Sequence, residues 1–322
     1  LAYAPRPDKA ALTNKAADFL ADNGYSEIMS NSLTKAAYYE GLSSYPAANC
    51  VRILNPLSVD LNVMRQTLLF NALEAVALNA NRKNGNLKLF ELGNCYFYDE
   101  TSADEQAPLT KYTEKYRIAL AVTGQDTTPS WNAKGAQASF YTLRSAVEKL
   151  LRRFGIDIYS LRSETLDSDL YADAIALMQG NKRMAEMGVV SPALMRRFDL
   201  KQPVYFAEID FELIVRSAKK QRIAVEELSK FPEVKRDLAL LVDKNVTFRQ
   251  LRDLAFKTER KLLKKVGLFD VYEGDKLPEG KKSYALNFVL EDTTKTMTDA
   301  VIDKVMSTLI AQFDAQLGAK VR

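Results

Sequence analysis

Apolar residues recur with the period of an amphipathic helix in three stretches upstream of residue 221, and they predict helices over 9–23, 61–81 and 141–154. Between and after these stretches lie runs that are rich in β-branched residues or that alternate apolar and polar positions. These runs predict strands over 25–32, 51–54, 87–98, 116–123, 174–179, 184–190 and 205–211. Because helices and strands mix without a regular βα alternation, the pattern favours an α+β fold built on an antiparallel sheet.

The last third of the chain, 229–322, follows a polar connector at 221–228 and has a clearer order of elements. The predicted sequence is strand 234–242, helix 248–260, strand 263–272, strand 283–290, helix 298–317 and strand 319–322. This β-α-β-β-α-β order is the ferredoxin-like topology. We therefore predict two domains, 1–220 and 229–322, joined by the connector.

In the ferredoxin-like topology both helices cover one face of the sheet, and alternation along the strands assigns each side chain to a face. The helix-covered face receives Leu238, Leu240, Phe269, Val271, Leu286 and Phe288. The open face receives Lys235, Asp237, Ala239, Asp270, Tyr272, Ser283, Ala285 and Asn287. A face that combines small residues, one aromatic ring and cations at its edge would let an unpaired nucleobase approach and stack.

The positive charge of the chain is unevenly placed. Residues 229–322 carry 18 Lys and Arg against 14 Asp and Glu, whereas residues 1–228 carry 27 of each. The whole formal excess of +4 therefore belongs to the last third of the sequence. This bias favours a polyanionic partner only weakly, because a solvated basic surface is its commoner cause.

The residue types that are missing narrow the chemistry. Histidine is absent, which excludes His-dependent triads, His general bases and His metal ligands within this chain. The sequence has no Walker or GxGxxG phosphate-binding motif. Cys50 and Cys95 lie far apart and outside ligand spacing, so we expect two buried thiols in a reducing cytoplasm. We predict neither catalytic residues nor a metal site.

The sequence gives no reason to expect a membrane partner. It contains neither a signal peptide nor an apolar run long enough to span a bilayer. We therefore expect a cytoplasmic location. Because the chain begins with Leu1 rather than Met, we also expect it to be part of a longer polypeptide.

Seven motifs in order carry a family resemblance. They are NPLSVDLNVMRQTLL (55–69), LFELGNCYF (89–97), MGVVSPAL (187–194), PVYFAEIDF (203–211), SKFPEVKRDLALLV (229–242), LFDVYEGDKLPEGKKSYAL (268–286) and LGAKVR (317–322). The first four resemble the synthetase-like domain of the bacterial phenylalanine–tRNA ligase beta chain. The last three resemble the ferredoxin-fold anticodon-binding domain of the same family. One segment, 170–178, departs from the pattern, since relatives often have His-Pro-Gly there.

The resemblance implies a division of labour between two kinds of chain. In this family the alpha chain handles ATP, phenylalanine and magnesium, so this chain is expected to need no cofactor of its own. The synthetase-like domain of the beta chain keeps the class II fold without its active site and packs against alpha in an α₂β₂ heterotetramer. Editing belongs to a more N-terminal domain that this chain is expected to lack. The expected partners are the alpha chain and phenylalanine tRNA.

Within this frame we predict a tRNA-binding surface in the last domain. Its residues are Arg236, Asp237, Ala239, Tyr272, Lys281, Lys282, Ser283, Asn287 and Arg322. Arg236, Lys281 and Lys282 are the leading phosphate contacts, and Tyr272 is the stacking candidate. The alternative without RNA contact is that Arg236 pairs with Asp237 or Asp270 and that the side chains of Lys281 and Lys282 are merely solvated.

Two other interpretations remain open. The chain could be an assembly module whose C-terminal domain docks on protein rather than RNA, or a self-sufficient enzyme that uses carboxylates and lysines. Glu91 and Arg65 are the residues that would suggest such an active site. An ion pair or a subunit contact is the favoured interpretation of both, because no acid–base partner is identifiable.

Overall fold

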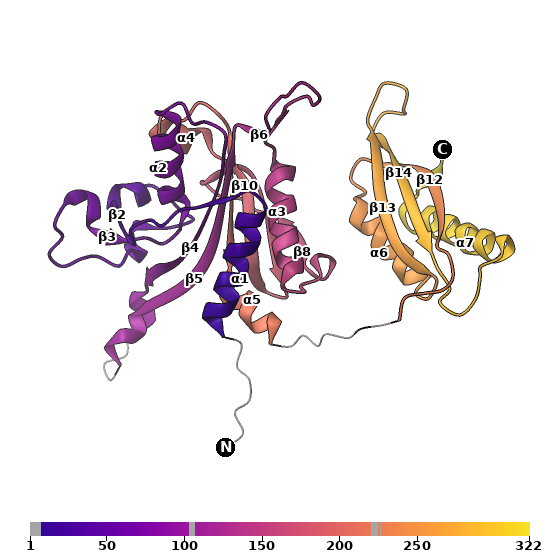
Figure 1. Ribbon diagram of the computed structural model, residues 1–322, viewed down its shortest axis with the longest axis horizontal. Helices are drawn as coiled ribbons and strands as arrows, with labels where there is room; N and C mark the ends of the chain where they lie inside the picture. The colour runs from indigo at the N-terminus through magenta and orange to yellow at the C-terminus, as the bar shows by residue number, and fades with distance from the viewer. Residues whose placement is uncertain (1–7, 103–106, 220–224, 226) are drawn as a thin grey trace, which may run out of the picture. The chain divides into compact units, whose positions relative to one another are not determined.

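The computed structural model describes residues 8–102, 107–219, 225 and 227–322 (Figure 1). Contacts within the chain divide it into two compact units, Leu1–Arg222 and Ile223–Arg322, and each unit is described by itself. Most of the predicted connector, 221–228, falls outside the described residues.

Unit 1 is built on a seven-stranded sheet with the strand order β1-β4-β5-β11-β10-β9-β8. Adjacent strands run antiparallel except β1 and β4, which are parallel. The strands are β1 (Ser26–Glu27), β4 (Leu87–Tyr98), β5 (Tyr112–Thr123), β8 (Arg162–Thr165), β9 (Tyr171–Gln179), β10 (Lys182–Val190) and β11 (Val204–Asp210). Two small ribbons pair β2 (Leu33–Thr34) with β3 (Val63–Met64) and β6 (Gln125–Thr127) with β7 (Ala136–Gln137).

Helices cover both faces of this sheet. They are α1 (Lys9–Asp22), α2 (Leu69–Ala80), α3 (Phe140–Arg153), α4 (Pro192–Arg197) and α5 (Phe211–Ala218). Short 3₁₀ turns connect the elements at Ala36–Tyr39, Ala47–Asn49, Val59–Leu61, Glu100–Ser102, Pro108–Lys111 and Ile158–Ser160. Strand β5 shows how the two cores form, since Leu120 packs with the cluster of α1, α3 and α5, and Ala121 packs with that of α2 and α4. Successive side chains of one strand therefore serve both layers.

Three predicted elements of unit 1 were wrong in extent, and one of them, the strand predicted over 25–32, is reduced to β1 (Ser26–Glu27). The helix predicted over 61–81 begins only at Leu69, because the segment before it pairs with other parts of the chain. Met64 donates its backbone N–H to Val51, and Arg65 donates to Ser32. The strand predicted over 51–54 is reduced to a single bridge between Arg52 and Val63.

Unit 2 has a four-stranded antiparallel sheet in the order β13-β14-β12-β15. The strands are β12 (Val234–Asp243), β13 (Leu263–Tyr272), β14 (Lys281–Leu290) and β15 (Lys320–Val321). The helices are α6 (Phe248–Thr258) and α7 (Asp299–Leu317), and the predicted β-α-β-β-α-β order is confirmed. Thr247 and Gln250 form a capping box at the start of α6, and Gly318 with φ +59° ends α7 in the left-handed region.

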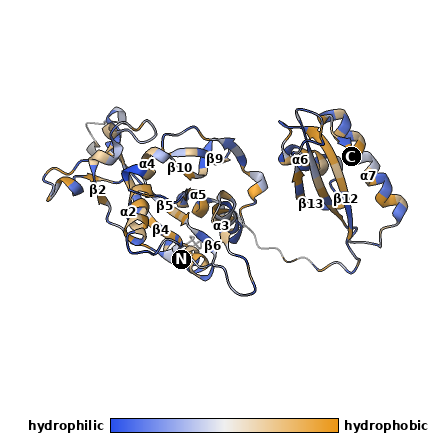
Figure 2. Ribbon diagram, turned by 90° about the horizontal axis from the view of Figure 1, so that it is seen from above, coloured by the Kyte–Doolittle hydropathy of each residue, from blue (hydrophilic) through white to orange (hydrophobic). Residues whose placement is uncertain are grey.

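The two helices of unit 2 pack on one face of its sheet. Their buried residues form a single core with Leu238, Leu240, Leu286 and Phe288, as predicted from alternation. Hydrophobic and hydrophilic positions both occur along α7, as expected for a helix with one buried side (Figure 2).

Phe269 and Val271 do not enter that core, since they are 59% and 46% exposed, although Val271 lies opposite Tyr284 on the helix-covered face as predicted. The register between β13 and β14 shifts between Leu268 and Asp270, so Phe269 is the extra residue of a β-bulge. Val271 lies near the end of β13, which is an edge strand and is covered less completely.

Candidate nucleic-acid interface

The face of the unit 2 sheet opposite its helices brings most of the predicted residues together. In the register of β12 and β14, Asp237 lies beside Asn287, and Ala239 lies beside Ala285. Tyr272 of β13 lies directly opposite Ser283 of β14. Directly opposed residues share a face, so these side chains form one surface, which we call the open face.

Tyr272 is held at one end of the open face by two close neighbours. The guanidinium carbon of Arg322 lies 5.3 Å from the centre of the Tyr272 ring, a cation–π distance. The backbone N–H of Arg322 donates to Ala239 O at 3.0 Å, which fixes the chain end beside β12. A Cβ on Gly274 would collide with the Tyr272 ring, so only glycine lets the ring adopt this position.

Asn287 presents an amide in the middle of the open face. Its Oδ1 atom is buried and has no hydrogen-bond partner among the described residues. A Cβ on Gly267, the residue paired with it on β13, would collide with Oδ1. Gly267 therefore provides the space in which the amide lies, and a buried unpaired oxygen is costly enough to suggest that a donor completes it.

The structure separates the predicted cations from one another. Arg236 contacts Asp299 at the start of α7, with 3.4 Å between Nη2 and Oδ1, rather than Asp237 or Asp270. Lys282 is buried, and its Nζ lies 4.7 Å from the centre of the Tyr284 ring. Both belong to the helix-covered side by strand alternation, so neither lies on the open face.

Other cations border the open face instead. Lys235 of β12 and Lys265 of β13 both pair in register with Val289 of β14, and both are exposed. At the other end of the strands, Lys281 pairs with Asp243, with 2.7 Å between Nζ and Oδ1. Positive charge therefore flanks the open face at the end that holds Lys235 and Lys265, whereas the charge of Lys281 at the other end is balanced by Asp243.

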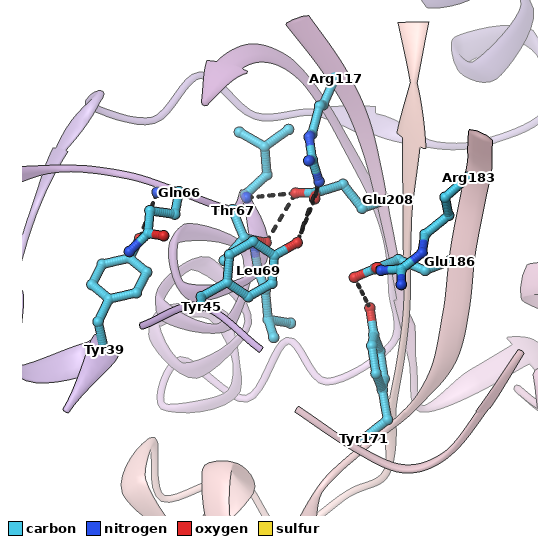
Figure 3. Close-up of polar contacts among 11 residues, drawn as sticks. Tyr39, Tyr45, Gln66, Thr67, Leu69, Arg117, Tyr171, Arg183, Glu186 and Glu208 are labelled. Carbon is cyan, nitrogen blue, oxygen red and sulfur yellow. Dashed lines mark hydrogen bonds and ion pairs between the residues drawn. The ribbon is translucent and has the colours of Figure 1, made fainter. Parts of the chain in front are cut away.

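Unit 1 holds a second polar constellation, which lies inside the molecule (Figure 3). The Glu208 carboxylate on β11 accepts hydrogen bonds from Thr67 Oγ1 at 2.9 Å and from the Leu68 backbone N–H at 2.8 Å. The same carboxylate is bonded by Arg117 of β5 and by the Tyr45 hydroxyl. Four donors thus converge on a carboxylate that is 2% exposed.

A second carboxylate, Glu186 on β10, is bonded in the same region. It accepts from Tyr171 Oη at 3.3 Å and from Arg183 Nη1 at 2.6 Å. Burial first, and then the charge of Glu208, raise the pKa of Glu186 above its ordinary value of 4.5. Burial also raises the pKa of the Tyr45 and Tyr171 hydroxyls well above the usual range, and both carboxylates add to this effect.

A cavity of about 460 Å³ adjoins this constellation and is lined by Tyr45, Phe97, Arg117, Arg183 and Glu186, among others. Glu208 is paired with Arg117 and Glu186 with Arg183, so neither carboxylate is poised as a general base for a bound substrate. Arg117 Nε has no hydrogen-bond partner among the described residues, but the arrangement is that of a structural ion-pair network rather than a site poised for acid–base chemistry.

Glu91 and Arg65 form a similar pair, which confirms the structural interpretation of both residues. Their side chains are each 3% exposed, and 2.7 Å separates Arg65 Nη1 from Glu91 Oε1. Glu91 also accepts from Ser30, and Arg65 also donates to Asn94 O. Gly93 leaves the room that the Arg65 guanidinium occupies.

Sequence reasoning missed the participants that depend on tertiary structure. Gly267 and Gly274 shape the open face, yet a glycine in a strand or loop has many other causes. Glu208 lies within the apolar run 204–209, where a charged residue is itself an unusual signal. That signal could have pointed to a buried ion pair.

Comparison with known proteins places these observations in a family. Residues 2–211 match the family model described as the phenylalanyl tRNA synthetase beta chain CLM domain, and residues 229–322 match that of the ferredoxin-fold anticodon binding domain. The phenylalanine–tRNA ligase beta subunit of Bacteroides fragilis is 47% identical over 312 residues, which is 97% of this chain and 38% of that protein. The corresponding subunit of Porphyromonas gingivalis is 42% identical over 304 residues, 94% of this chain and 37% of that protein.

The chain thus spans less than two fifths of the length of these relatives. Among solved structures, a pyrrolysyl tRNA synthetase from Desulfitobacterium hafniense has a TM-score of 0.50 at 18% identity. That similarity covers 66% of this chain and 70% of the other chain. It concerns the fold alone, and it confirms the predicted synthetase-like architecture.

Proposed function

This chain belongs to the phenylalanyl-tRNA synthetase beta chain family, and on that premise we propose that it is a non-catalytic part of phenylalanine–tRNA ligase. Unit 2 binds the anticodon region of phenylalanine tRNA, and unit 1 serves as a scaffold for the catalytic alpha chain in an α₂β₂ enzyme of the cytoplasm. ATP and magnesium are used by the alpha chain in this proposal.

The proposed binding of tRNA by unit 2 rests on the open face of its sheet. Ala239 and Ala285 make its centre shallow, Tyr272 supplies a ring at one end, and Lys235 and Lys265 supply cations at the other. Unpaired bases stack on aromatic rings while phosphates contact lysines and arginines, and this surface offers both within one sheet face. Asn287 adds an amide that can hydrogen-bond to a base edge.

The scaffold half of the proposal is supported by large apolar side chains that unit 1 leaves in water. Met29 follows β1 and is 93% exposed, and Leu54, Leu57 and Val59 are exposed by 93%, 100% and 81% in the segment before β3. Such a group of large apolar side chains marks a protein contact. We assign the exposed apolar segment with Leu54, Leu57 and Val59 to the contact with the alpha chain.

One observation favours the alternative that unit 2 contacts protein rather than RNA. Two of the three leading phosphate contacts, Arg236 and Lys282, are engaged on the helix-covered side, which leaves the open face with fewer cations than predicted. RNA affinity would then depend on Lys235, Lys265 and Arg322.

The proposal is tested by titrating the chain, alone and with purified alpha chain, with the anticodon stem-loop of phenylalanine tRNA and with an unrelated stem-loop. We expect a preference for the cognate stem-loop that weakens as salt rises. Equal binding of both stem-loops in the presence of alpha chain would contradict the RNA half. Failure of the alpha chain to associate with this chain would contradict the scaffold half.

A further inference from the structure

Asn71, near the start of α2, is a buried side chain whose amide is poorly satisfied. Only 6% of the residue is exposed, and its Oδ1 atom has no hydrogen-bond partner among the described residues. Its Nδ2 atom donates to Asn31 O across 3.5 Å, which is the outer limit for a hydrogen bond. A buried amide oxygen without a donor lowers the stability of a fold, so it calls for an explanation outside the fold.

Asn71 lines a cavity of about 330 Å³. The wall that α2 contributes is one stripe of the helix, at positions i, i+3, i+4 and i+7, made by Asn71, Glu74, Ala75 and Leu78. The other walls come from the segment 30–35, which includes β2, and from the 3₁₀ turn Val59–Leu61. Because only the long contact to Asn31 O fixes the amide plane, a donor in the cavity can draw the Asn71 oxygen toward itself.

The charged side chains in the cavity lining, Lys35, Asp60 and Glu74, leave a net negative charge. Lys35 Nζ lies 3.5 Å from Asp60 Oδ1, so these two charges offset each other. Glu74 Oε1 accepts from the Tyr38 hydroxyl at 2.6 Å. Burial first, and then Glu74, raise the pKa of this hydroxyl, so it is a neutral donor and does not balance the charge of Glu74. The cavity therefore favours a cation over an anion such as an RNA phosphate.

The rest of the lining fits an apolar stem. Leu33, Leu61 and Ala75 contribute apolar side chains, and Leu78 is 54% exposed, so methylene groups that cover it gain burial. An alkyl chain that ends in a guanidinium or ammonium group matches both parts of the cavity, since its stem packs on leucines while its N–H groups face an amide oxygen and a carboxylate. A metal ion does not match, because the described residues contain no group of three or more His, Cys, Asp or Glu side chains that could hold one.

We propose that this cavity binds an alkyl-guanidinium or alkyl-ammonium group, with Asn71 Oδ1 and the Glu74 carboxylate as its acceptors. We assign the group to an arginine or lysine side chain of the alpha chain, an assignment that rests on the proposed scaffold function. Asp60 and Leu61 of the cavity belong to the same 3₁₀ turn as Val59, which is 81% exposed in the segment assigned to that contact. A free diamine has the same chemistry, and the test distinguishes it from a side chain.

The first test asks whether the cavity binds a cation of this shape. n-Butylguanidinium is titrated into the 322-residue chain and followed by saturation-transfer difference NMR, with n-butylurea as a neutral probe of the same shape. We expect saturable binding of n-butylguanidinium with a Kd on the order of a millimolar, as is usual for so small a ligand. Binding of n-butylurea should be at least about fivefold weaker because it lacks the charge. Equal binding of both probes, or no saturable binding of either, would overturn the inference.

Two variants separate a ligand site from a structural role. Asn71→Leu keeps the branched shape of the side chain and removes the unpaired oxygen. Unit 1 should then be at least as stable as wild type in urea unfolding, while n-butylguanidinium binds at least about fivefold more weakly. Lost stability with unchanged binding is the result that a purely structural Asn71 predicts, and it would contradict the proposal.

Glu74→Gln keeps an acceptor for Tyr38 but removes the charge, and it should also weaken n-butylguanidinium binding at least about fivefold. The matched control is Glu148→Gln, the same change on α3 outside the cavity lining, which should leave the Kd within about twofold. Equal Kd values for the two variants would show that the charge of Glu74 does not hold the cation.

The second test asks which molecule supplies the cation, by repeating the titration with n-butylguanidinium and with putrescine in the presence of alpha chain. We expect alpha chain to abolish the binding of both probes, and Asn71→Leu to weaken alpha-chain affinity at least about fivefold. If alpha chain associates but both probes still bind with unchanged affinity, the cavity serves a free diamine, and the assignment to alpha chain fails while the scaffold function stands. If alpha chain does not associate with the wild-type chain at all, the scaffold function and this assignment fail together.

Discussion

Unit 1 and unit 2 are both antiparallel sheets with helices packed on them, but they treat polar side chains in opposite ways. In unit 1 both faces are covered, and Glu91, Glu186 and Glu208 are buried and paired with arginines from the same unit. In unit 2 only one face is covered, and Asp237 remains exposed on the other. The buried carboxylates of unit 1 are thus engaged in ion pairs within the unit, while polar side chains on the open face of unit 2 remain available to a ligand.

The difference shows that helices packed on an antiparallel sheet can either engage its polar side chains internally or leave them exposed. A buried carboxylate that accepts four hydrogen bonds fixes the positions of β5, β11 and the segment before α2, but it has no capacity left for a substrate. An open sheet face keeps its hydrogen-bonding capacity at the cost of solvent exposure.

The largest expected effect is on the stability of unit 1. Glu208→Gln keeps the shape of the side chain but removes the negative charge that balances buried Arg117. Leaving one partner of a buried pair unpaired costs about 3–5 kcal/mol. Urea unfolding followed by circular dichroism, fitted with a separate transition for each unit, measures this loss, and the transition of unit 2 should not move.

The matched control for this variant is Glu212→Gln. Glu212 is half-exposed, and its Oε2 lies 3.8 Å from Arg216 Nη2 one turn along α5, so its removal should cost less than about 0.5 kcal/mol. If both variants cost the same, the buried network is not what stabilises unit 1.

The next effect concerns the open face. Tyr272→Ala removes the ring on which a base stacks, and loss of one stacked base costs about 1–3 kcal/mol, or roughly 5- to 150-fold in the Kd for cognate tRNA. Tyr112→Ala, which removes a half-exposed ring (50%) from β5 of unit 1, should leave this Kd unchanged. Filter binding of radiolabelled tRNA, with alpha chain present, measures both. An unchanged Kd for Tyr272→Ala would remove this ring from the interface.

The smallest effect is a pH dependence within unit 1. Because burial and Glu208 raise the pKa of Glu186, the folded state favours its protonated form. Its contribution to stability is therefore complete below its ordinary pKa of 4.5 and is lost as pH rises through the raised folded-state value. Relative to Glu186→Gln, wild type should lose stability as the pH rises from 4.5 toward neutral. Thermal unfolding of both proteins across this range measures the difference, and parallel curves would show that Glu186 does not titrate in this way.

The sequence pattern predicted the regular parts of both units but not the places where the chain pairs with itself over long distances. Unit 2 followed its alternation and capping signals closely, apart from the bulge that leaves Phe269 exposed. In unit 1, the apolar periodicity over 61–81 predicted a helix that includes residues 63–68. The conformation of these residues is instead set by their contacts with Val51, Ser32 and Glu208. Such partners leave no local signature.

Strand periodicity also decides which residues of the open face could be predicted from the sequence. Alternation alone placed Ala239, Tyr272, Ser283 and Asn287 on one face, because a strand repeats every two residues. The cations were chosen by charge and position rather than by strand phase, so Arg236 and Lys282 were grouped with residues that lie on the opposite face.

The most direct test of the account compares cations on the two faces of the unit 2 sheet. The Kd for phenylalanine tRNA is measured against salt concentration for wild type, for an open-face variant (Lys235→Ala with Lys265→Ala) and for a helix-face variant (Arg236→Ala with Lys282→Ala). If the open face binds RNA, the open-face variant should lose roughly 0.7–0.9 of the log–log salt slope per lost phosphate contact, while the helix-face variant keeps the wild-type slope. The opposite outcome, a slope lost only in the helix-face variant, would place the RNA on the other side of the sheet and contradict the account.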